Sequence, residues 1–410
     1  MTINKKIGFY LNWAREIDFY SSTLQKIDLS KVVFIINDLN RSISSHKIEQ
    51  KIIKEILIKK NYEFCLLSEI LGKIKFDILI STGDLGISKI TTRSFLKYVY
   101  RRTIGELLIL LKLNLFFQNK LNIKIKVGGI KATLYEEFFV ENLISFNSVK
   151  FPNGLDRNIK HYPNNKWKNV FDIYLAASLV EEKLIKKKFK NKKIFLSGYP
   201  RFFKDTQNNL EYLKQEFKFD TKKKNIICLP NERIMSMQNE NAIYAYLKFL
   251  KNLQLDFNLI LRPHPKLLLV KPKYFEILRN SGIKLDLDPK RRIEDLIRVS
   301  DLVIVDYGSS VLEGIYLNKR IAFYEWPHKK DFEIFHDKEN CLDYIIREKF
   351  DFKFLNHIEG KRTNLIIKNI ISDKTYLDGI KNLETKLFGS QKIKFDPKVI
   401  IDRYYDQKNY

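Results

Sequence analysis

Short apolar runs alternate with longer amphipathic runs along most of the 410 residues. Short runs of branched or aromatic residues predict strands that are buried on both faces, and longer amphipathic runs predict helices. Strands are predicted at 7–11, 32–36, 64–66, 76–80, 123–127, 172–176, 225–229, 258–262, 283–287, 302–305 and 320–324. Helices are predicted at 44–57, 92–117, 241–252, 274–281, 292–300 and 311–317. The alternation predicts an α/β protein with two doubly wound, Rossmann-like domains facing a cleft.

The lysine-rich stretch 181–193 is the expected boundary, because it lacks apolar periodicity and precedes the strand-like Ile194-Phe195-Leu196. We therefore predict an N-terminal acceptor-binding domain over residues 1–190 and a C-terminal nucleotide-donor-binding domain over 191–390. Residues 391–410 are predicted to form a C-terminal tail. In this interpretation, 194–196 is the first strand of the second domain.

The charge is strongly positive: 74 Lys and Arg against 48 Asp and Glu give a formal +26. Such a charge favours phosphate-rich partners, and an Ile-, Lys- and Asn-rich composition explains it equally well. No zinc finger or RNA-binding signature is present, which argues against nucleic acid as a partner. Three distant cysteines, Cys65, Cys228 and Cys341, indicate free thiols rather than disulfides. With neither a signal peptide nor a long apolar run, we expect a cytoplasmic protein, soluble or peripheral on the inner face of the cell membrane.

The sequence Leu261-Arg262-Pro263-His264-Pro265 follows a predicted strand. Two prolines fix the backbone on either side of His264, so the imidazole is held on a stiff loop beside the Arg262 guanidinium. That pair suits a phosphate oxygen. The alternative is a surface histidine in a proline-bounded turn.

A second motif runs from Asp306 through Tyr307-Gly308-Ser309-Ser310 to Glu313, after the predicted strand 302–305. The serine hydroxyls and the first N–H groups of the next helix converge where a phosphate can bind. Glu313 is predicted in the first helical turn, where it can accept hydrogen bonds from a ribose. The alternative is an ordinary N-cap by Ser309 or Ser310, with Glu313 closing a capping box.

A third motif, Gly198-Tyr199-Pro200-Arg201, follows the strand 194–196. Glycine permits close approach of a ligand to the backbone, and Arg201 adds a positive charge. The alternative is a plain turn.

Taken in order, Gly198 to Arg201, Arg262 to Pro265 and Ser300-Asp301 to Ser310 resemble the CDP-glycerol glycerophosphotransferases, the family of teichoic acid polymerases and primases. The resemblance covers roughly residues 194–330. It implies the two-domain glycosyltransferase fold called GT-B, with a CDP-alcohol on the C-terminal domain and the acceptor on the N-terminal one. By position, His264 would contact the donor phosphates, Ser309 and Ser310 would hold the pyrophosphate, and Arg262 would support it.

The chain departs from that family at one position. Members usually carry a His-Gly pair in the N-terminal half, whose histidine is a candidate general base. The nearest equivalent here is Asn153-Gly154, and an asparagine takes no proton. Asp84, Asp156 and His161 are the alternative candidates. Asp84 follows the predicted strand 76–80 through a Ser-Thr-Gly turn.

The predicted function is therefore transfer of glycerol phosphate, or a related alditol phosphate, from a CDP-alcohol to a saccharide or lipid-linked glycan, without a metal cofactor. The His-Pro pair and the serine pair are also similar to bacterial sialyl- and Kdo-transferases, which use CMP-sugars in capsule or lipopolysaccharide synthesis. A GT-B binding module without catalysis is a third hypothesis, motivated by Asn153.

Two basic segments add a surface hypothesis. In 92–117, Lys97, Arg101, Arg102 and Lys112 interleave with aliphatic and aromatic side chains, and 186–193 holds a cluster of six lysines. The first pattern suits a helix resting on anionic headgroups or a site for a lipid-linked acceptor. A core-facing helix followed by a solvated lysine run fits equally well.

Overall fold

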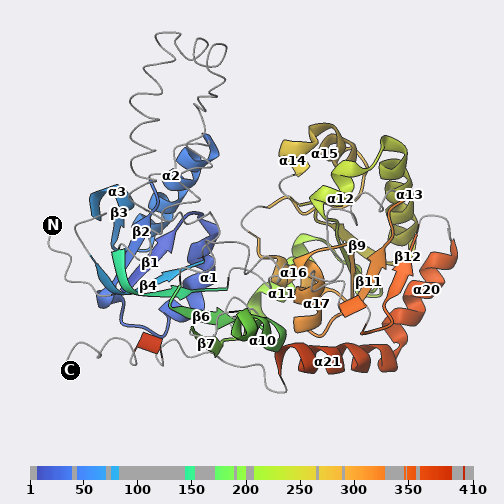
Figure 1. The fold of residues 1–410 in the computed structure, drawn as a ribbon. Helices are drawn as coiled ribbons and strands as arrows, with labels where there is room; N and C mark the ends of the chain where they lie inside the picture. The colour runs from blue at the N-terminus through green and yellow to red at the C-terminus, as the bar shows by residue number, and fades with distance from the viewer. Residues whose placement is uncertain are drawn as a thin grey trace, which may run out of the picture.

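A computed structural model shows two parallel β-sheets with helices packed against them (Figure 1). The predicted α/β class with two doubly wound sheets is confirmed. The structure describes residues 7–38, 44–70, 75–82, 144–152, 171–188, 192–199, 207–264, 267–288, 291–327, 346–347, 349–356, 361–389 and 400–401. The predicted strand 123–127, the helix 92–117 and Cys341 lie outside these ranges.

The first sheet has the strand order β3-β2-β1-β4-β5-β6-β7, and all its pairs are parallel. β1, β2, β4 and β6 are largely apolar and buried, as expected for strands covered on both faces, whereas the inner strand β5 is mainly polar and its Phe146 is 52% exposed. The bounds are β1 Ile7–Leu11, β2 Val32–Ile36, β3 Phe64–Leu66, β4 Phe76–Ser81, β5 Ser145–Lys150, β6 Ile173–Ala176 and β7 Lys193–Leu196. The helical elements among them are α1 Arg15–Leu24, the 3-10 turn η1 Leu29–Lys31, α2 Ser44–Lys59 and α3 Leu67–Ile70.

The strand 194–196 was assigned to the wrong sheet in the sequence analysis. β7 pairs with β6, with Leu175 opposite Phe195 and Ala176 opposite Leu196, and so forms the edge of the first sheet. The lysine-rich stretch before it forms helix α10, Leu179–Lys188, rather than an open linker. Ser178 and Glu181 start that helix as a capping box, with the Ser178 hydroxyl accepting from the Glu181 N–H at 3.0 Å.

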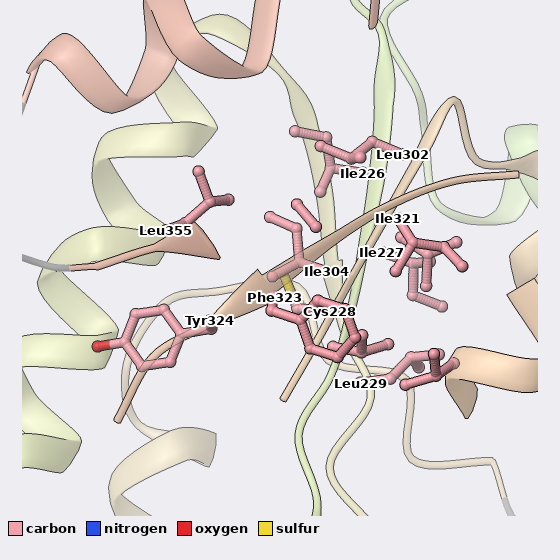
Figure 2. Packing of buried hydrophobic residues seen from close by; sticks show 14 of the residues in the cluster. Ile226, Ile227, Cys228, Leu229, Leu302, Ile304, Ile321, Phe323, Tyr324 and Leu355 are labelled. Atoms are coloured by element: carbon pink, nitrogen blue, oxygen red, sulfur yellow. The ribbon is translucent and has the colours of Figure 1, made fainter. Parts of the chain in front are cut away.

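The second sheet has the strand order β12-β11-β10-β8-β9 and is also parallel. Its core is aliphatic and aromatic, with Ile226, Cys228, Ile304 and Phe323 packed together (Figure 2). The bounds are β8 Asn225–Leu229, β9 Asn258–Leu261, β10 Leu302–Val305, β11 Arg320–Tyr324 and β12 Lys353–Leu355. The predicted strand 283–287 is reduced to a single bridge between Leu285 and Leu261, made by the Leu261 N–H donating to the Lys284 carbonyl and the Asp286 N–H donating to the Leu261 carbonyl.

The helices of the second half cover both faces of its sheet. Their bounds are α11 Gln207–Glu216, α12 Glu232–Met237, α13 Glu240–Asp256, α14 Leu267–Val270, α15 Pro272–Arg279, α16 Ile293–Val299, α17 Ser309–Tyr316, α20 Lys361–Ser372 and α21 Lys374–Phe388. Within the described residues, no helix is long and apolar enough to cross a membrane. Cys65 and Cys228 are buried free thiols, as predicted.

The two halves are joined by more than one segment. Helix α21 packs against α17 and also against α10, which follows the sixth strand of the first sheet (Figure 1). Ile400 and Ile401 are buried in the core of the first sheet, so the segment predicted to be a tail returns to the N-terminal half. Tyr199, just after β7, is buried in the core of the second half.

Candidate active site

The strand order of the second sheet defines a binding edge. β8 and β10 are neighbours in the sheet. The chain runs from β8 to β9 on one side of this pair and from β10 to β11 on the other. The loops that follow these two strands therefore separate at a topological switch point, where open α/β sheets bind ligands. Pro230 to Glu232 follow β8, and Asp306 to Ser310 follow β10. The loop with His264, after β9, borders the same edge.

Asp306 binds the two loops of this switch point to each other. Its side chain is buried and accepts from the Asn231 backbone N–H at 2.9 and 3.0 Å, from the Tyr307 N–H at 2.6 Å and from the Trp326 indole N–H at 2.9 Å. The Arg347 guanidinium donates to the Asp306 carbonyl at 2.5 Å. A carboxylate with these partners holds the ends of β8, β10 and β11 in fixed positions. The geometry points to a positioning role for Asp306 rather than direct contact with a donor.

Burial also changes the acidity of this group. Desolvation raises the pKa of the Asp306 carboxyl from its ordinary 3.8 to about 7, although the hydrogen bonds from Trp326, Asn231 and Tyr307 favour the ionised form. Desolvation is therefore the dominant cause. The Asp306 carboxyl, which links the two loops of the switch point, therefore changes its charge near neutral pH.

The turn after Asp306 brings helix α17 to the edge. Gly308 has φ of 121°, a conformation that glycine adopts without strain, and α17 begins at the next residue. No side chain caps this helix, so the alternative of a serine N-cap is wrong. Ser309 is exposed and Ser310 half-buried, and neither hydroxyl makes a hydrogen bond within the described residues. The first turn thus offers N–H groups and two hydroxyls to an anion.

Glu313 lies deeper than predicted. Because α17 begins at Ser309, Glu313 lies in its second turn, and the helix has no acidic residue in its first turn. The side chain is only 5% exposed. The capping box that the sequence allowed is therefore absent, and the proposed ribose contact would require Glu313 to be reached from the edge.

His264 pairs with a residue that the sequence analysis did not select. Its Nδ1 lies 4.0 Å from Oε2 of Glu232, in the first turn of α12. The histidine side chain is 43% exposed and the glutamate 14%. A carboxylate beside an imidazole favours one orientation of the ring. Glu232 could have been found, since it lies three residues after the predicted strand 225–229, at the edge where the other motifs were sought.

Arg262 is turned away from this pair into an ion-pair network. Its guanidinium binds the buried Asp286 carboxylate and donates to the Arg291 carbonyl at 2.8 Å. Arg291 donates to the second oxygen of Asp286 at 2.9 Å and pairs with Glu216. These contacts stiffen the loop behind His264. They favour a supporting role for Arg262, as the resemblance implies, carried through the loop rather than through phosphate.

Gly198 adopts φ of 61°, a left-handed conformation that suits glycine, directly after β7 and Ser197. The Ser197 hydroxyl lies 2.9 Å from the Gly198 carbonyl. The structure therefore places Gly198 where the chain passes from the first sheet to the core of the second half. Arg201 lies outside the described residues.

The first sheet has a corresponding switch point, between β1 and β4. Glu16 is buried there, and its carboxylate accepts from the backbone N–H of Asn12 at 2.5 Å, from that of Trp13 at 3.0 Å and from the Thr82 hydroxyl. One buried carboxylate thus braces the switch point of each sheet.

The candidate bases Asp84, Asp156 and His161, and also Asn153, lie outside the described residues. Among the residues described, no cluster has the ligands for a metal ion.

One family model matches the central part of the chain. Residues 153–345 match the model of the CDP-glycerol:poly(glycerophosphate) glycerophosphotransferases. This range contains the whole edge described above, from Glu232 and His264 to Ser310. The resemblance given by the motifs is confirmed, and with it the predicted class of enzyme. No curated protein matches the chain.

Solved structures show the same fold at low identity. The wall teichoic acid polymerase TagF matches with a TM-score of 0.54 and 11% identity, over 98% of this chain and 89% of that one. A TagF variant soaked with CDPG matches with a TM-score of 0.53 and 13% identity, over 99% and 90%. A UDP-N-acetylglucosamine 2-epimerase, described as putative, from Listeria monocytogenes matches with 0.50 and 12%, over 98% and 97%. At such identities the likeness shows the fold, and it confirms the predicted GT-B-like arrangement.

Proposed function

We propose that this protein transfers glycerol phosphate from CDP-glycerol to a hydroxyl group of a poly(glycerophosphate) or other lipid-linked acceptor. One observation carries the proposal: the residues that match the glycerophosphotransferase family place His264 and the uncapped start of α17 around a single switch point. That edge supplies an imidazole, two hydroxyls and helix N–H groups, which are groups that bind a diphosphate.

The reaction is a displacement at phosphorus. The acceptor oxygen forms a bond to the phosphorus that carries glycerol, the bond from that phosphorus to the bridging oxygen breaks, and CMP leaves with the bridging oxygen. The start of α17 binds the phosphates and stabilises their charge, and His264, oriented by Glu232, binds a phosphate oxygen. The acceptor proton passes to a base of the first half, for which Asp84 is our first candidate.

A donor screen tests the proposal directly. The full chain is incubated with CDP-glycerol, CDP-ribitol, CMP-Kdo or CMP-sialic acid and an acceptor, and products are identified by mass. We expect turnover with CDP-glycerol. Release of CMP alone does not discriminate, because both donor classes release it. Transfer of a sugar would support the CMP-sugar alternative, and no turnover with any donor would support the binding-module hypothesis.

Replacing His264 with alanine tests the donor contact. Loss of one charge-assisted phosphate contact costs about 1.5–3 kcal/mol, which lowers kcat/KM for CDP-glycerol about 10- to 100-fold. The melting temperature should change little because the side chain is 43% exposed. Glu232→Gln, which keeps the imidazole and removes only its carboxylate neighbour, should have a smaller effect. Unchanged kinetics in a folded His264→Ala protein would contradict the assignment.

Replacing Ser309 and Ser310 together with alanine tests the start of α17. A ligand that binds only the folded state raises the melting temperature, so CMP should raise that of wild type. If the hydroxyls bind phosphate, CMP should no longer raise the melting temperature of the variant. Because neither serine caps the helix, we expect a loss of stability below the roughly 0.5–2 kcal/mol typical of a removed cap. Ser372→Ala, at an exposed helical serine of α20, is the matched control. Full retention of the CMP effect would count against the phosphate site.

A further inference from the structure

Two helices of the second half, α13 and α15, enclose an open groove of about 620 Å³. Helix α13 lines it with Tyr244, Leu247, Lys248 and Lys251, and α15 lines it with four residues at the same spacing, beginning at Lys273. The spacing i, i+3, i+4, i+7 is that of a single helix face. The two helices pack against each other at the upper end of the second half (Figure 1). We call this feature the α13–α15 groove.

The groove begins at the donor edge and runs away from it. Because β8 and β9 are parallel, α12 and α13 carry the chain from the carboxyl end of the sheet back to its amino end. The start of α15 lies beside the start of α13, since Lys273 pairs with Glu240 at 2.5 Å. Helix α12, which begins at Glu232, the neighbour of His264, leads directly into this end. The groove is therefore a path from the donor edge along the side of the second half.

Two lysines of the groove are exposed and lie one turn apart on α13, namely Lys248 and Lys251. No ion pair links either of them to a carboxylate within the part of the chain that the structure describes. Lys273 is paired with Glu240, and Glu276 adds a further negative charge to the lining. Three positive groups thus face two negative ones, and the positive excess lies at Lys248 and Lys251, away from the donor edge.

We propose that the α13–α15 groove binds the acceptor polymer, a chain of glycerol phosphate units, as a second subsite beyond the donor edge. The inference rests on the proposed function, which makes the acceptor a polyanion. Such a chain carries one negative charge in each unit, and Lys248 and Lys251 pair with its phosphates. Between the charges lie short carbon segments, which pack on Leu247, only 6% exposed, and on the half-buried Ile277. The exposed amide of Asn280 can bind the free hydroxyls.

The subsite predicts that acceptors of different length bind differently. The lining of α13 from Tyr244 to Lys251 extends about 10 Å along the helix axis. A chain long enough to reach Lys251 from the donor edge gains contacts that a single glycerol phosphate cannot make. These contacts are the same before and during the reaction, so they lower KM and leave kcat unchanged. Longer acceptors should therefore have a lower KM at equal kcat.

Direct binding to the full chain tests the inference. The probe is a synthetic glycerol phosphate oligomer without lipid, labelled with a fluorophore at one end, and binding is measured by fluorescence anisotropy. We expect Lys248→Ala/Lys251→Ala to raise the Kd about tenfold, which is the scale of two exposed ion contacts. Glu276→Gln removes a repelling charge and should lower the Kd about threefold. Added salt should weaken wild-type binding, because the contacts are exposed and ionic.

The matched control removes two exposed lysines elsewhere. Lys374→Ala/Lys386→Ala, on α21, changes the net charge by the same amount and should bind the oligomer as wild type does. Polyglutamate of matched charge and phosphatidylglycerol vesicles represent the competing occupants, an acidic protein segment and a bilayer. The inference is overturned if wild type does not bind the oligomer, or if the groove and α21 variants bind it equally. A larger loss of polyglutamate or vesicle binding than of oligomer binding in the groove variant would also overturn it.

The test is separable from the proposed function. With glycerol phosphate as the acceptor, Lys248→Ala/Lys251→Ala should turn over CDP-glycerol as wild type does, because neither lysine belongs to the donor edge. With the long oligomer, its KM should rise about tenfold at unchanged kcat. Absence of turnover in wild type would count against the proposed reaction, while anisotropy would still decide the groove. Loss of kcat with glycerol phosphate in the variant alone, with normal melting, would place the lysines in the donor site and contradict a polymer subsite.

Discussion

The Asp84→Asn variant is expected to lose transfer by about 10²–10⁴-fold in kcat while still binding CMP, because a positioned base contributes that much to hydroxyl attack. The structure supports the location from the residues before it. β4 ends at Ser81, and the Thr82 hydroxyl donates to Glu16 at the switch point of the first sheet. The chain thus enters the segment with Asp84 from the ligand-binding edge.

The measurement compares kcat for CDP-glycerol with the CMP-induced rise in melting temperature. Asp156→Asn is the matched control and should have a smaller effect, since Asp156 lies six residues after the end of β5, whereas Asp84 lies only three residues after the end of β4. Thr82→Val separates a disturbed turn from a missing base, because it removes the hydroxyl contact to Glu16 and keeps Asp84. Near-normal turnover of Asp84→Asn would rule out Asp84 as the base and make His161 the next candidate.

The apolar runs predicted the sheets well where strands were continuous and buried. β1, β2, β8 and β10 match their predicted bounds because each is an uninterrupted buried run. Periodicity could not tell to which sheet 194–196 belongs, because a strand of four residues pairs equally well at either edge. Only the pairing with β6 decides this, and it depends on how α10 returns the chain to the first sheet.

The candidate site was predicted from loops that follow strands, and the structure does place His264 and the serine pair directly after β9 and β10. The prediction failed to find Glu232 because the Pro-Asn-Glu sequence has no motif character of its own. The contacts of Asp306 could not be read from the sequence at all. Trp326 and Arg347 lie 20 and 41 residues further along the chain, and only the fold brings Trp326 to the Asp306 carboxylate and Arg347 to the Asp306 backbone carbonyl.

The roles of Arg262 and Glu313 show the limit of motif reasoning in physical terms. A side chain next to a predicted ligand site can point towards the ligand or into the protein, and sequence position does not distinguish the two. Arg262 finds the buried carboxylate of Asp286, and Glu313 lies one helical turn further from the edge than expected. A charged group that is left unpaired on burial costs several kcal/mol, so internal partners compete strongly for it.

The Asp306→Asn variant is expected to change how stability depends on pH. Burial raises the pKa of the Asp306 carboxyl to about 7, above its ordinary 3.8. Between about pH 4 and pH 7 the folded protein therefore binds a proton that the unfolded chain has released. The stability that this group contributes is full below about pH 4 and is lost as the pH rises through about 7. A difference of roughly three pKa units corresponds to about 4 kcal/mol.

Urea unfolding of wild type and Asp306→Asn at pH 5, 6, 7 and 8 measures this effect. Between pH 5 and pH 8 the free energy of unfolding of wild type should fall relative to that of the variant by about 3 kcal/mol, which is the part of the linkage that lies above pH 5. Asp351→Asn, at a carboxylate whose side chain is 87% exposed, should run parallel to wild type at every pH. A wild-type curve parallel to that of Asp306→Asn would mean that Asp306 does not titrate in this window.

The same variant tests the brace at the donor edge. An amide has one acceptor oxygen and two N–H donors, so it cannot accept from Asn231, Tyr307 and Trp326 together, and it points donors at donors. The loops after β8 and β10 should then separate, which displaces Glu232 from His264 and the start of α17 from the phosphates. We expect the Kd of CMP to be about tenfold higher for Asp306→Asn than for wild type, because about 1–2 kcal/mol of positioned contacts is lost. Unchanged CMP affinity would contradict the positioning role.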